Sequence, residues 1–258
     1  MAYETLKLER EGPLLTVRLN RPRKGNAISH QMHLELQAIF HELAEDFQTR
    51  VVILAGEGRA FSSGADTSEW GKPGPDSELE LRHLTSMGSR TAAALESLDQ
   101  VTIAAVHGFA VGGAVVLALC CDLRVAGRST WFSIPEVELG IPFTWNALPR
   151  LSREVGPSRA LELTVTCKRF SAEQAYDYGM LSRVTADGDE ITVARELAHR
   201  IIGMPPLPVA LTKATMRALK RGSEMGDAVH SDPDLLLYAR LLQQRGARRS
   251  GGGDVSWA

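Results

Sequence analysis

The chain has 258 residues, of which 44% are hydrophobic and 23% charged, and its formal net charge is −2. This length and composition suit a globular protein whose core needs no disulfide or metal support. The nearly balanced charge argues against nucleic acid and membranes as general partners. The three cysteines fit neither a disulfide framework nor a zinc site, and the first residues show no signal-peptide pattern, so we expect a reduced, cytoplasmic protein without a metal.

The first part of the chain alternates between strand and helix patterns. Apolar and polar residues alternate in two short stretches within residues 3–20, which predicts two strands, and the basic loop Arg21–Asn26 follows them. Ser29 is placed as a helix N-cap, because apolar residues recur at helical spacing from Met32 to Phe47. The continuous apolar stretch Val51–Ala55 predicts a buried strand.

After a loop over residues 56–66, glycines and prolines within residues 67–78 predict a mobile segment. The patterns that follow predict a helix over 78–98, strands over 101–106, 122–126 and 130–137, and a buried helix over 114–120. The uncharged stretch Val101–Cys121 is long enough to span a membrane. It contains His107 and three glycines, however, so a strand, a turn and a helix explain it better.

From Gly140-Ile141-Pro142 onward the pattern is mostly helical. Ser171 and Gln174 form a capping box, and prolines at 205, 206 and 208 separate two further helices. We therefore expect an α/β fold with a core over residues 1–200, a helical region over 201–245 and a disordered tail over 246–258.

Several familiar motifs are incomplete. The stretch Gly56–Phe61 has phenylalanine where a dinucleotide fingerprint needs its third glycine. His30 and His33 have no third metal ligand near them in the sequence, so we expect both on the surface. Two loops of small residues remain, Ser62–Asp66 and Gly108–Gly113. Their backbone N–H groups could together hold an oxyanion, although both loops could equally be tight turns that need glycine.

Four segments carry a resemblance to a known family. They are Asn20-Arg21-Pro22 with Asn26-Ala27, Ala60 to Asp66, Ile103 to Asp122, and Pro135-Glu136 with Leu139 to Pro142. In this combination and order they resemble the enoyl-CoA hydratase/isomerase family, also called the crotonase family. The resemblance covers residues from about 3 to about 222 and implies a superhelix of ββα turns with C-terminal helices used for trimerisation. It also implies an acyl-CoA substrate, no separate cofactor, and a homotrimer or a dimer of trimers.

The resemblance also assigns roles to single residues. The backbone N–H groups of Ala65 and Gly113 would hold the thioester oxygen and so stabilise an enolate. Arg23 and Lys24 stand where the family places groups near the CoA phosphates, although a solvated basic loop is the alternative. The remaining substrate contacts would come from Ser63, Gly64, Asp66, Gly112 and Val116. For Asp66 we favour a loop-capping role over catalysis.

The family's hydratases use two glutamates to hold and activate one water molecule. The first lies three positions after Gly113, where this chain has Val116, and the second matches Glu136. Since valine cannot exchange a proton, the resemblance favours a Δ3-to-Δ2 enoyl-CoA isomerase. In that reaction Glu136 takes the α-proton and returns it at C4.

Alternatives to isomerisation stay open. They are hydration with Glu136 alone, a decarboxylase or other lyase reaction, and a non-catalytic acyl-CoA-binding role. RNA binding, reported for some relatives, is disfavoured by the net charge of −2. Glu138 would point away from Glu136 if this stretch is extended, which suggests a structural role. An acyl pocket could draw on Trp70, Leu84, Met87, Phe109, Phe143 and Trp145. The tail lacks the basic and aromatic pattern with which family members hold CoA.

Overall fold

The computed structural model describes residues 3–70 and 77–222. Its strands are β1 (Leu6–Glu11), β2 (Leu14–Leu19), β3 (Val51–Gly56), β4 (Val101–Val106), β5 (Phe109–Val111), β6 (Leu123–Gly127), β7 (Trp131–Ser133), β8 (Phe170–Ser171) and β9 (Arg183–Thr185). Its α-helices are α1 (His30–Ala44), α2 (Glu78–Thr85), α3 (Met87–Ser97), α4 (Gly113–Cys120), α5 (Ala147–Val155), α6 (Pro157–Thr166), α7 (Ala172–Asp177), α8 (Glu190–Ile202) and α9 (Pro206–Gly222). Single 3-10 turns span Pro22–Lys24 and Thr67–Glu69.

Two sheets organise the chain. The larger has the strand order β1-β2-β3-β4-β6-β9, in which β1 and β2 are antiparallel and all other neighbours are parallel. Parallel neighbours require crossover connections, which here run through helices such as α1 between β2 and β3. The smaller sheet has the order β5-β7-β8. The predicted α/β class is confirmed.

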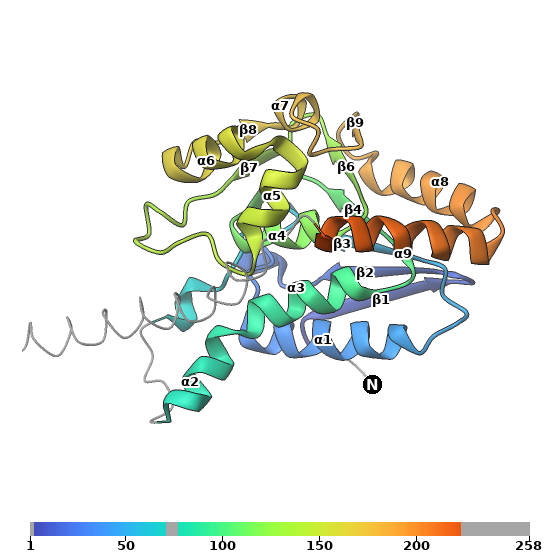
Figure 1. The fold of residues 1–258 in the computed structure, drawn as a ribbon, viewed down its shortest axis with the longest axis horizontal. Coiled ribbons are helices and arrows are strands. Elements are labelled where there is room, and N and C mark those ends of the chain that lie inside the picture. The colour runs from blue at the N-terminus through green and yellow to red at the C-terminus, as the bar shows by residue number, and fades with distance from the viewer. Residues whose placement is uncertain (1–2, 71–76, 223–258) are drawn as a thin grey trace, which may run out of the picture.

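The larger sheet is covered on both faces. Val52 and Leu54 of β3 belong to the core formed with α1, α3 and α4, whereas Val51, Ile53 and Ala55 pack toward α8. This explains why β3 is continuously apolar, since a strand in the middle of a covered parallel sheet has no solvent face. Figure 1 shows α1 and α3 on one side of this sheet and α8 on the other.

The segment from β4 to α4 passes through the junction of the two sheets, and this positions the candidate site. β4 leads through His107 and Gly108 into β5, and β5 leads directly into α4. All eight residues of α4 are buried, so its N-terminus is fixed by packing on every side. The strand and the buried helix expected within residues 101–121 are confirmed, but the short strand β5 lies where a turn was expected. Among the described residues, no helix is long and apolar enough to cross a membrane.

Several predicted boundaries are wrong. The helix expected over 78–98 is two helices, because the chain bends at Ser86. The helix after Ser29 ends at Ala44, and Phe47 beyond it is 86% exposed. The strand expected over 130–137 ends at Ser133 and gives way to a turn. The short strands β8 and β9 lie in the half expected to be helical. Each has three residues or fewer, too short to show a period of two.

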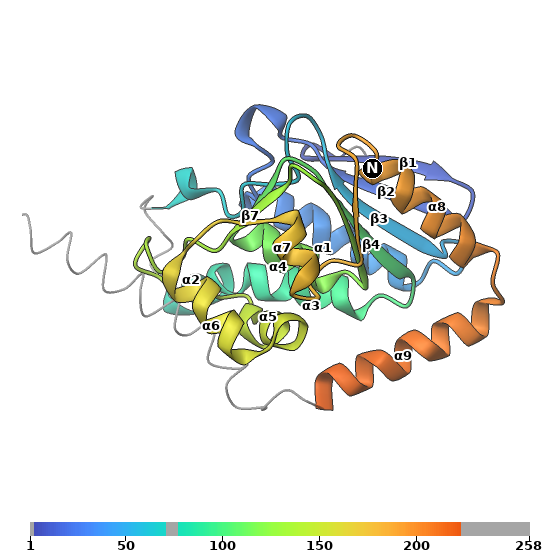
Figure 2. The same cartoon turned by 90° about the horizontal axis from the view of Figure 1, so that it is seen from above.

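The described part of the helical region expected over 201–245 contains the end of α8 and the whole of α9, and residues 223–245 of that region lie outside the described residues. In Figure 2, α9 extends along one side of the molecule. It is anchored by Lys213, whose Nζ lies 2.7 Å from Asp122 Oδ2 and donates to Gln100 O at 2.6 Å. The capping box at Ser171 and Gln174 is confirmed. The expected mobile segment falls partly on residues 71–76, and the expected disordered tail falls wholly outside the described residues.

Candidate active site

The loop that follows β3 is fixed by neighbours on both sides. Ile28 pairs with Ala65 in a parallel bridge, in which the Ile28 N–H donates to Gly64 O at 2.8 Å. On the other side Ser62 pairs with Ala110 of β5 in a second parallel bridge. The loop Ser62–Asp66 is thus held between the N-terminal segment and the smaller sheet, and Ala65 has a defined orientation.

The second small-residue loop meets the first at the start of α4. Gly112 has φ 53° and ψ −117°, a conformation that favours glycine, and its N–H donates to Ser133 O at 2.9 Å. Gly64, at φ 82°, packs directly against this loop. A Cβ atom on Gly64 would overlap Val111 O and lie 3.2 Å from Gly113 N. The two loops therefore touch through glycine, where a side chain would force them apart.

Two backbone N–H groups at this junction have no acceptor among the residues that the structure describes. Among residues 3–70 and 77–222, neither Ala65 N nor Gly113 N donates a hydrogen bond to another group. Gly113 is the first residue of α4, so its N–H is one of those that a helix leaves unsatisfied and that carry its positive end. Two such donors on adjoining loops suit an oxygen atom that gains negative charge.

Glu136 lies beside these donors. It follows β7 in the turn of residues 136–140, and a Cβ on Gly112 would overlap its Oε1 atom. Its Oε2 atom is buried and has no hydrogen-bond partner in the described part of the chain. Burial raises the pKa of Glu136 from 4.5 to about 7, because the charged form loses its hydration. A carboxyl group with this pKa can both accept and return a proton near neutral pH.

Val116, which stands where the family's hydratases have their first glutamate, lies in the first turn of α4. Val116 is 1% exposed, and its N–H donates to Gly112 O at 3.3 Å. The valine is therefore part of the packed interior beside the second loop and adds no titratable group there. Glu138, by contrast, is exposed in the turn after Glu136, so the extended geometry expected for this pair is wrong.

Asp66 has a structural role, as expected. One carboxylate oxygen accepts from Ser68 N and Oγ at 3.1 and 2.6 Å, which caps the 3-10 turn Thr67–Glu69. The other lies 2.8 Å from Nη1 of Arg21. Burial opposes ionisation of this carboxyl group, but these partners outweigh it and hold its pKa below its usual value. Asp66 thus fixes the end of the loop that presents Ala65.

The predicted phosphate contacts lie on the surface next to the same loop. Arg23 and Lys24 are exposed in the 3-10 turn Pro22–Lys24, and neither forms an ion pair within the described ranges. Ser63 joins this turn to the loop, since its N–H donates to Gly25 O at 2.8 Å and its Oγ to Lys24 O at 3.3 Å. Within the described part of the chain, two cations without an ion-pair partner are therefore available to an anionic ligand at this rim.

Asn26 connects the segments around the site. The sequence indicates it only as part of a motif. Its side chain is fully buried, and its Nδ2 donates to the carbonyl oxygens of Glu57, Ala60 and Phe61. Its Oδ1 accepts from Arg21 N at 2.9 Å. The role cannot be read from the sequence, because these carbonyl groups are brought together only by the fold.

The expectation of two surface histidines is wrong for His33. His30 is exposed, but His33 is buried, with its ring edge-on to Trp145 at a centroid distance of 5.0 Å. Its Nδ1 lies 2.8 Å from Thr91 Oγ1. Burial lowers the pKa of His33 to about 3, which keeps the ring neutral. Within the described residues, no group of three or more His, Cys, Asp or Glu side chains could hold a metal ion.

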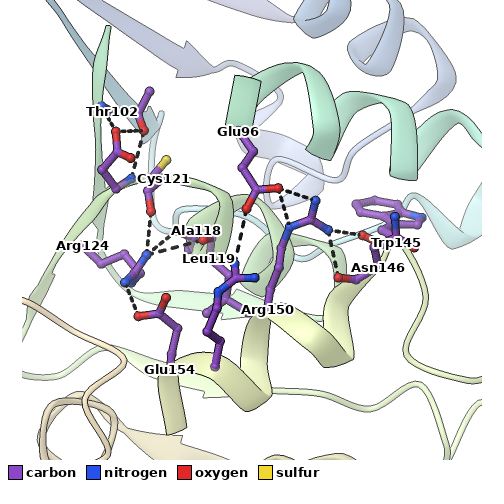
Figure 3. A network of polar contacts seen from close by, with 12 residues as sticks. Glu96, Thr102, Ala118, Leu119, Cys121, Arg124, Trp145, Asn146, Arg150 and Glu154 are labelled. Carbon is purple, nitrogen blue, oxygen red and sulfur yellow. Dashed lines mark hydrogen bonds and ion pairs between the residues drawn. The ribbon is translucent and has the colours of Figure 1, made fainter. Parts of the chain in front are cut away.

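Trp145 is held by a polar network that the sequence did not reveal (Figure 3). Trp145 and Asn146 have φ angles of 64° and 56°, which side-chain-bearing residues rarely adopt. Arg150 Nη1 donates to both of their carbonyl oxygens, at 2.8 and 2.9 Å, while its Nη2 lies 2.7 Å from Glu96 Oε2. Burial opposes ionisation of Glu96, but Arg150 and Arg153 outweigh it and lower its pKa. The network ties the Trp145 turn to α3.

The fold and the site define a mixed α/β protein in which two adjoining loops present backbone donors beside one buried carboxyl group. The family model for enoyl-CoA hydratase/isomerase matches residues 9–244. The chain belongs to the enoyl-CoA hydratase/isomerase family. The predicted crotonase-like fold is confirmed by this match and by the solved structures of relatives.

Three relatives illustrate the range of names in the family. The short-chain-enoyl-CoA hydratase of Clostridium acetobutylicum is 34% identical and covers 87% of this chain and 84% of its own length. The crystal structure of enoyl-CoA hydratase from Bacillus anthracis matches with a TM-score of 0.79 at 31% identity and covers 96% of each chain. A monofunctional enoyl CoA isomerase from M. smegmatis has a TM-score of 0.70 at 31% identity and covers 86% of this chain and 96% of its own.

Proposed function

We propose that this protein moves the double bond of a 3-enoyl-CoA to the 2-position. The observation that carries the proposal is the carboxyl group of Glu136, whose Oε2 atom is buried, beside the N–H groups of Ala65 and Gly113, which donate to no group within the described residues. Isomerisation needs one group that removes a proton and returns it to the same molecule, together with donors for the enolate oxygen. Hydration in this family uses a second glutamate, and this chain has Val116 in its place.

The steps balance with the groups at hand. The ionised Glu136 carboxylate removes a proton from C2 of the 3-enoyl thioester, and the electron pair of that C–H bond moves into a dienolate. The Ala65 and Gly113 N–H groups hold the thioester oxygen, which carries the new negative charge. The protonated Glu136 then donates the proton to C4, the double bond forms between C2 and C3, and the carboxylate is restored.

The surroundings of Glu136 favour transfer within the site over capture of water. Its Oε2 atom is buried and has no hydrogen-bond partner among the described residues, and the Val116 side chain offers no hydrogen bond that would hold a water molecule on the other side of the substrate. Hydration remains the second candidate, because two of the three relatives described above are named hydratases. In that reaction Glu136 alone would activate the water.

A product assay separates these functions. Purified protein is mixed in turn with a 3-enoyl-CoA and a 2-enoyl-CoA, and the thioesters are separated by chromatography. We expect the 3-enoyl substrate to become the 2-enoyl thioester. Glu136→Gln should reduce this rate by about 10²–10⁴-fold, a typical contribution of a general base. Glu138→Gln, the same change two residues away on an exposed side chain, is the matched control and should leave the rate unchanged.

Each other outcome of this assay has a definite meaning. A 3-hydroxyacyl-CoA formed from the 2-enoyl substrate would replace isomerisation by hydration. If neither substrate reacts although CoA thioesters bind, another enolate reaction or a binding role takes its place. Loss of activity in Glu138→Gln as great as that in Glu136→Gln would contradict the assignment of Glu136.

We also propose a homotrimer or a dimer of trimers. Support comes from α9, which carries exposed large apolar side chains on the surface of the isolated chain. Leu207, Leu211 and Leu219 are 66%, 58% and 64% exposed. Apolar side chains gathered on one helix are typical of a protein interface. For the CoA part of the substrate we propose the rim formed by Arg23, Lys24 and Ser63, where the two cations would meet phosphate groups.

A further inference from the structure

Trp145 fills a space that two helices leave open. Its indole lies between Gly88 of α3 and Gly113 of α4, and a Cβ atom on either glycine would overlap the ring. The benzene edge of the indole faces Gly113, whereas its pyrrole part faces Gly88. The side chain is 7% exposed, so it is packed on nearly all sides. It is therefore a large, fixed wall that directly adjoins one of the two oxyanion donors.

The ring has little freedom to move. His33 contacts it edge-on from α1, and His33 itself is fixed through Thr91 of α3. The backbone of Trp145 is held at positive φ by Arg150, which is anchored to Glu96. A residue keeps a disfavoured backbone conformation, such as the positive φ of Trp145, only when the surrounding contacts enforce it. Such residues cluster at functional sites.

We infer that Trp145 forms the end wall of the acyl site and restricts the substrate to short acyl chains. This inference rests on the proposed binding of acyl-CoA thioesters. The thioester oxygen would lie at the Gly113 N–H and C2 of the acyl chain near Glu136, which adjoins Gly112. Carbons beyond the reacting ones then approach the indole edge at Gly113. The ring has little room to yield toward α3 or α4, because the space beside Gly88 and Gly113 does not admit even an added Cβ atom.

Trp145 is thus a specificity-determining residue. Its test needs a readout of acyl-chain length that does not depend on turnover. Saturated acyl-CoA thioesters serve this purpose, since they bind without reacting. Dissociation constants of butanoyl-, hexanoyl- and decanoyl-CoA are measured by titration calorimetry for the wild-type protein, Trp145→Ala and Trp145→Phe. Trp131→Phe is the matched control, because Trp131 is half-exposed on β7 and stacks with Phe109 and Arg169.

We expect the wild-type protein to bind butanoyl-CoA more tightly than decanoyl-CoA. Trp145→Ala should improve the affinity for decanoyl-CoA relative to butanoyl-CoA by at least about tenfold, since a few methylene groups in an apolar pocket discriminate to this extent. Trp145→Phe should shift the ratio in the same direction by less, and it decides the matter if Trp145→Ala does not fold. Trp131→Phe should keep the wild-type ratio.

Two results would overturn the inference. One is a wild-type affinity for decanoyl-CoA equal to that for butanoyl-CoA, and the other is a wild-type ratio in both Trp145 variants. Both leave acyl-CoA binding intact and so do not affect the proposed function. Absence of binding by every thioester would overturn the proposed function and this inference together. If the Trp145 variants shift the ratio of the decanoyl-CoA and butanoyl-CoA affinities but the wild-type protein shows no isomerase turnover, the role of Trp145 as end wall stands and the proposed isomerase function is wrong.

Discussion

Glu136 is the residue on which the proposed isomerisation depends, and its environment decides what it can do. In water a glutamate is ionised at neutral pH and is a weak base. Here burial raises its pKa to about 7, and Oε2 lacks a hydrogen-bond partner in the described part of the chain. The ionised form is therefore poorly stabilised by the protein, which makes it a stronger base. The same desolvation makes the protonated form a usable acid in the second half of the reaction.

The raised pKa of Glu136 predicts the pH dependence of the activity. The base must be ionised to remove the first proton, so kcat/KM should rise with pH through a single ionisation near the value of about 7 and level off above it. The measurement is kcat/KM for a 3-enoyl-CoA across this range. A profile that is flat from pH 5 to pH 9, or that falls as pH rises through 7, would contradict the assignment.

The same ionisation predicts an effect on stability. The pKa of Glu136 is higher in the folded protein than the ordinary value of 4.5, so the protonated form favours folding. This contribution is complete below pH 4.5 and is lost as pH rises through about 7. Glu136→Gln, which stays neutral, should therefore become more stable relative to the wild type between these two pH values. Urea denaturation at both ends of the range measures this change, and a constant difference would argue against a buried Glu136.

At the level of elements, the site is the place where a loop, a strand and a helix end meet through glycines. Gly112 has φ 53°, and a Cβ there would overlap the Glu136 carboxyl group. Gly64 allows the first loop to touch the second. The N-terminus of the buried helix α4 then presents Gly113 at this contact. A side chain at Gly64 would press on the loop that presents the Gly113 donor, one at Gly112 would displace the Glu136 carboxyl group, and one at Gly113 would overlap Trp145.

This arrangement predicts a specific loss in Gly112→Ala. The substitution combines an unfavourable φ, which costs about 1–3 kcal/mol, with displacement of the carboxyl group. We expect kcat to fall by at least about tenfold, since a displacement of about 1 Å in a catalytic group can cost more than that. Gly12→Ala is the matched control, because Gly12 has φ 54° and no atom within 4 Å of an added Cβ. Gly12→Ala should lose stability but keep its kcat. If Gly12→Ala lost as much kcat as Gly112→Ala, the loss in Gly112→Ala would be due to reduced stability alone.

The elements differ in how far their sequences predict them. Val51–Ala55 and the cap at Ser29 are strong local signals, and both are confirmed. The bend at Ser86 is not predictable in this way, because both flanking segments keep a helical pattern. His33 illustrates the same limit at the candidate site, since only the fold brings Trp145 against it. The small-residue loops were recognisable, whereas the network of Glu96 and Arg150 joins residues far apart in the chain.

At the level of the whole molecule, two cores on opposite faces of one sheet support the site while α9 remains on the outside. Lys213 anchors this helix, yet its outer face carries leucines that are more than half exposed. A surface of this kind costs solubility unless another molecule covers it. In the proposed trimer or hexamer, α9 would lie between subunits. The isolated chain would then expose surface that the assembly buries.

Sedimentation velocity tests this assembly. We expect the wild-type protein to sediment as three or six copies, and Leu211→Glu to shift the distribution toward the monomer, because a charge in an apolar interface is costly to bury. Leu79→Glu, the same change on α2 at a side chain that is 79% exposed, is the control. A wild-type monomer at micromolar concentration would contradict the proposed assembly.

In the proposed isomerisation, one carboxyl group moves a proton within the substrate and no bound water molecule takes part. Its most direct test uses a 3-enoyl-CoA with deuterium at C2 and a mass-spectrometric or NMR assay for the label in the product. We expect a 2-enoyl product that carries deuterium at C4, because the Oε2 atom of Glu136 is buried and a deuteron held there would exchange slowly with solvent. A product with only solvent hydrogen at C4, or with a hydroxyl group at C3, would contradict it.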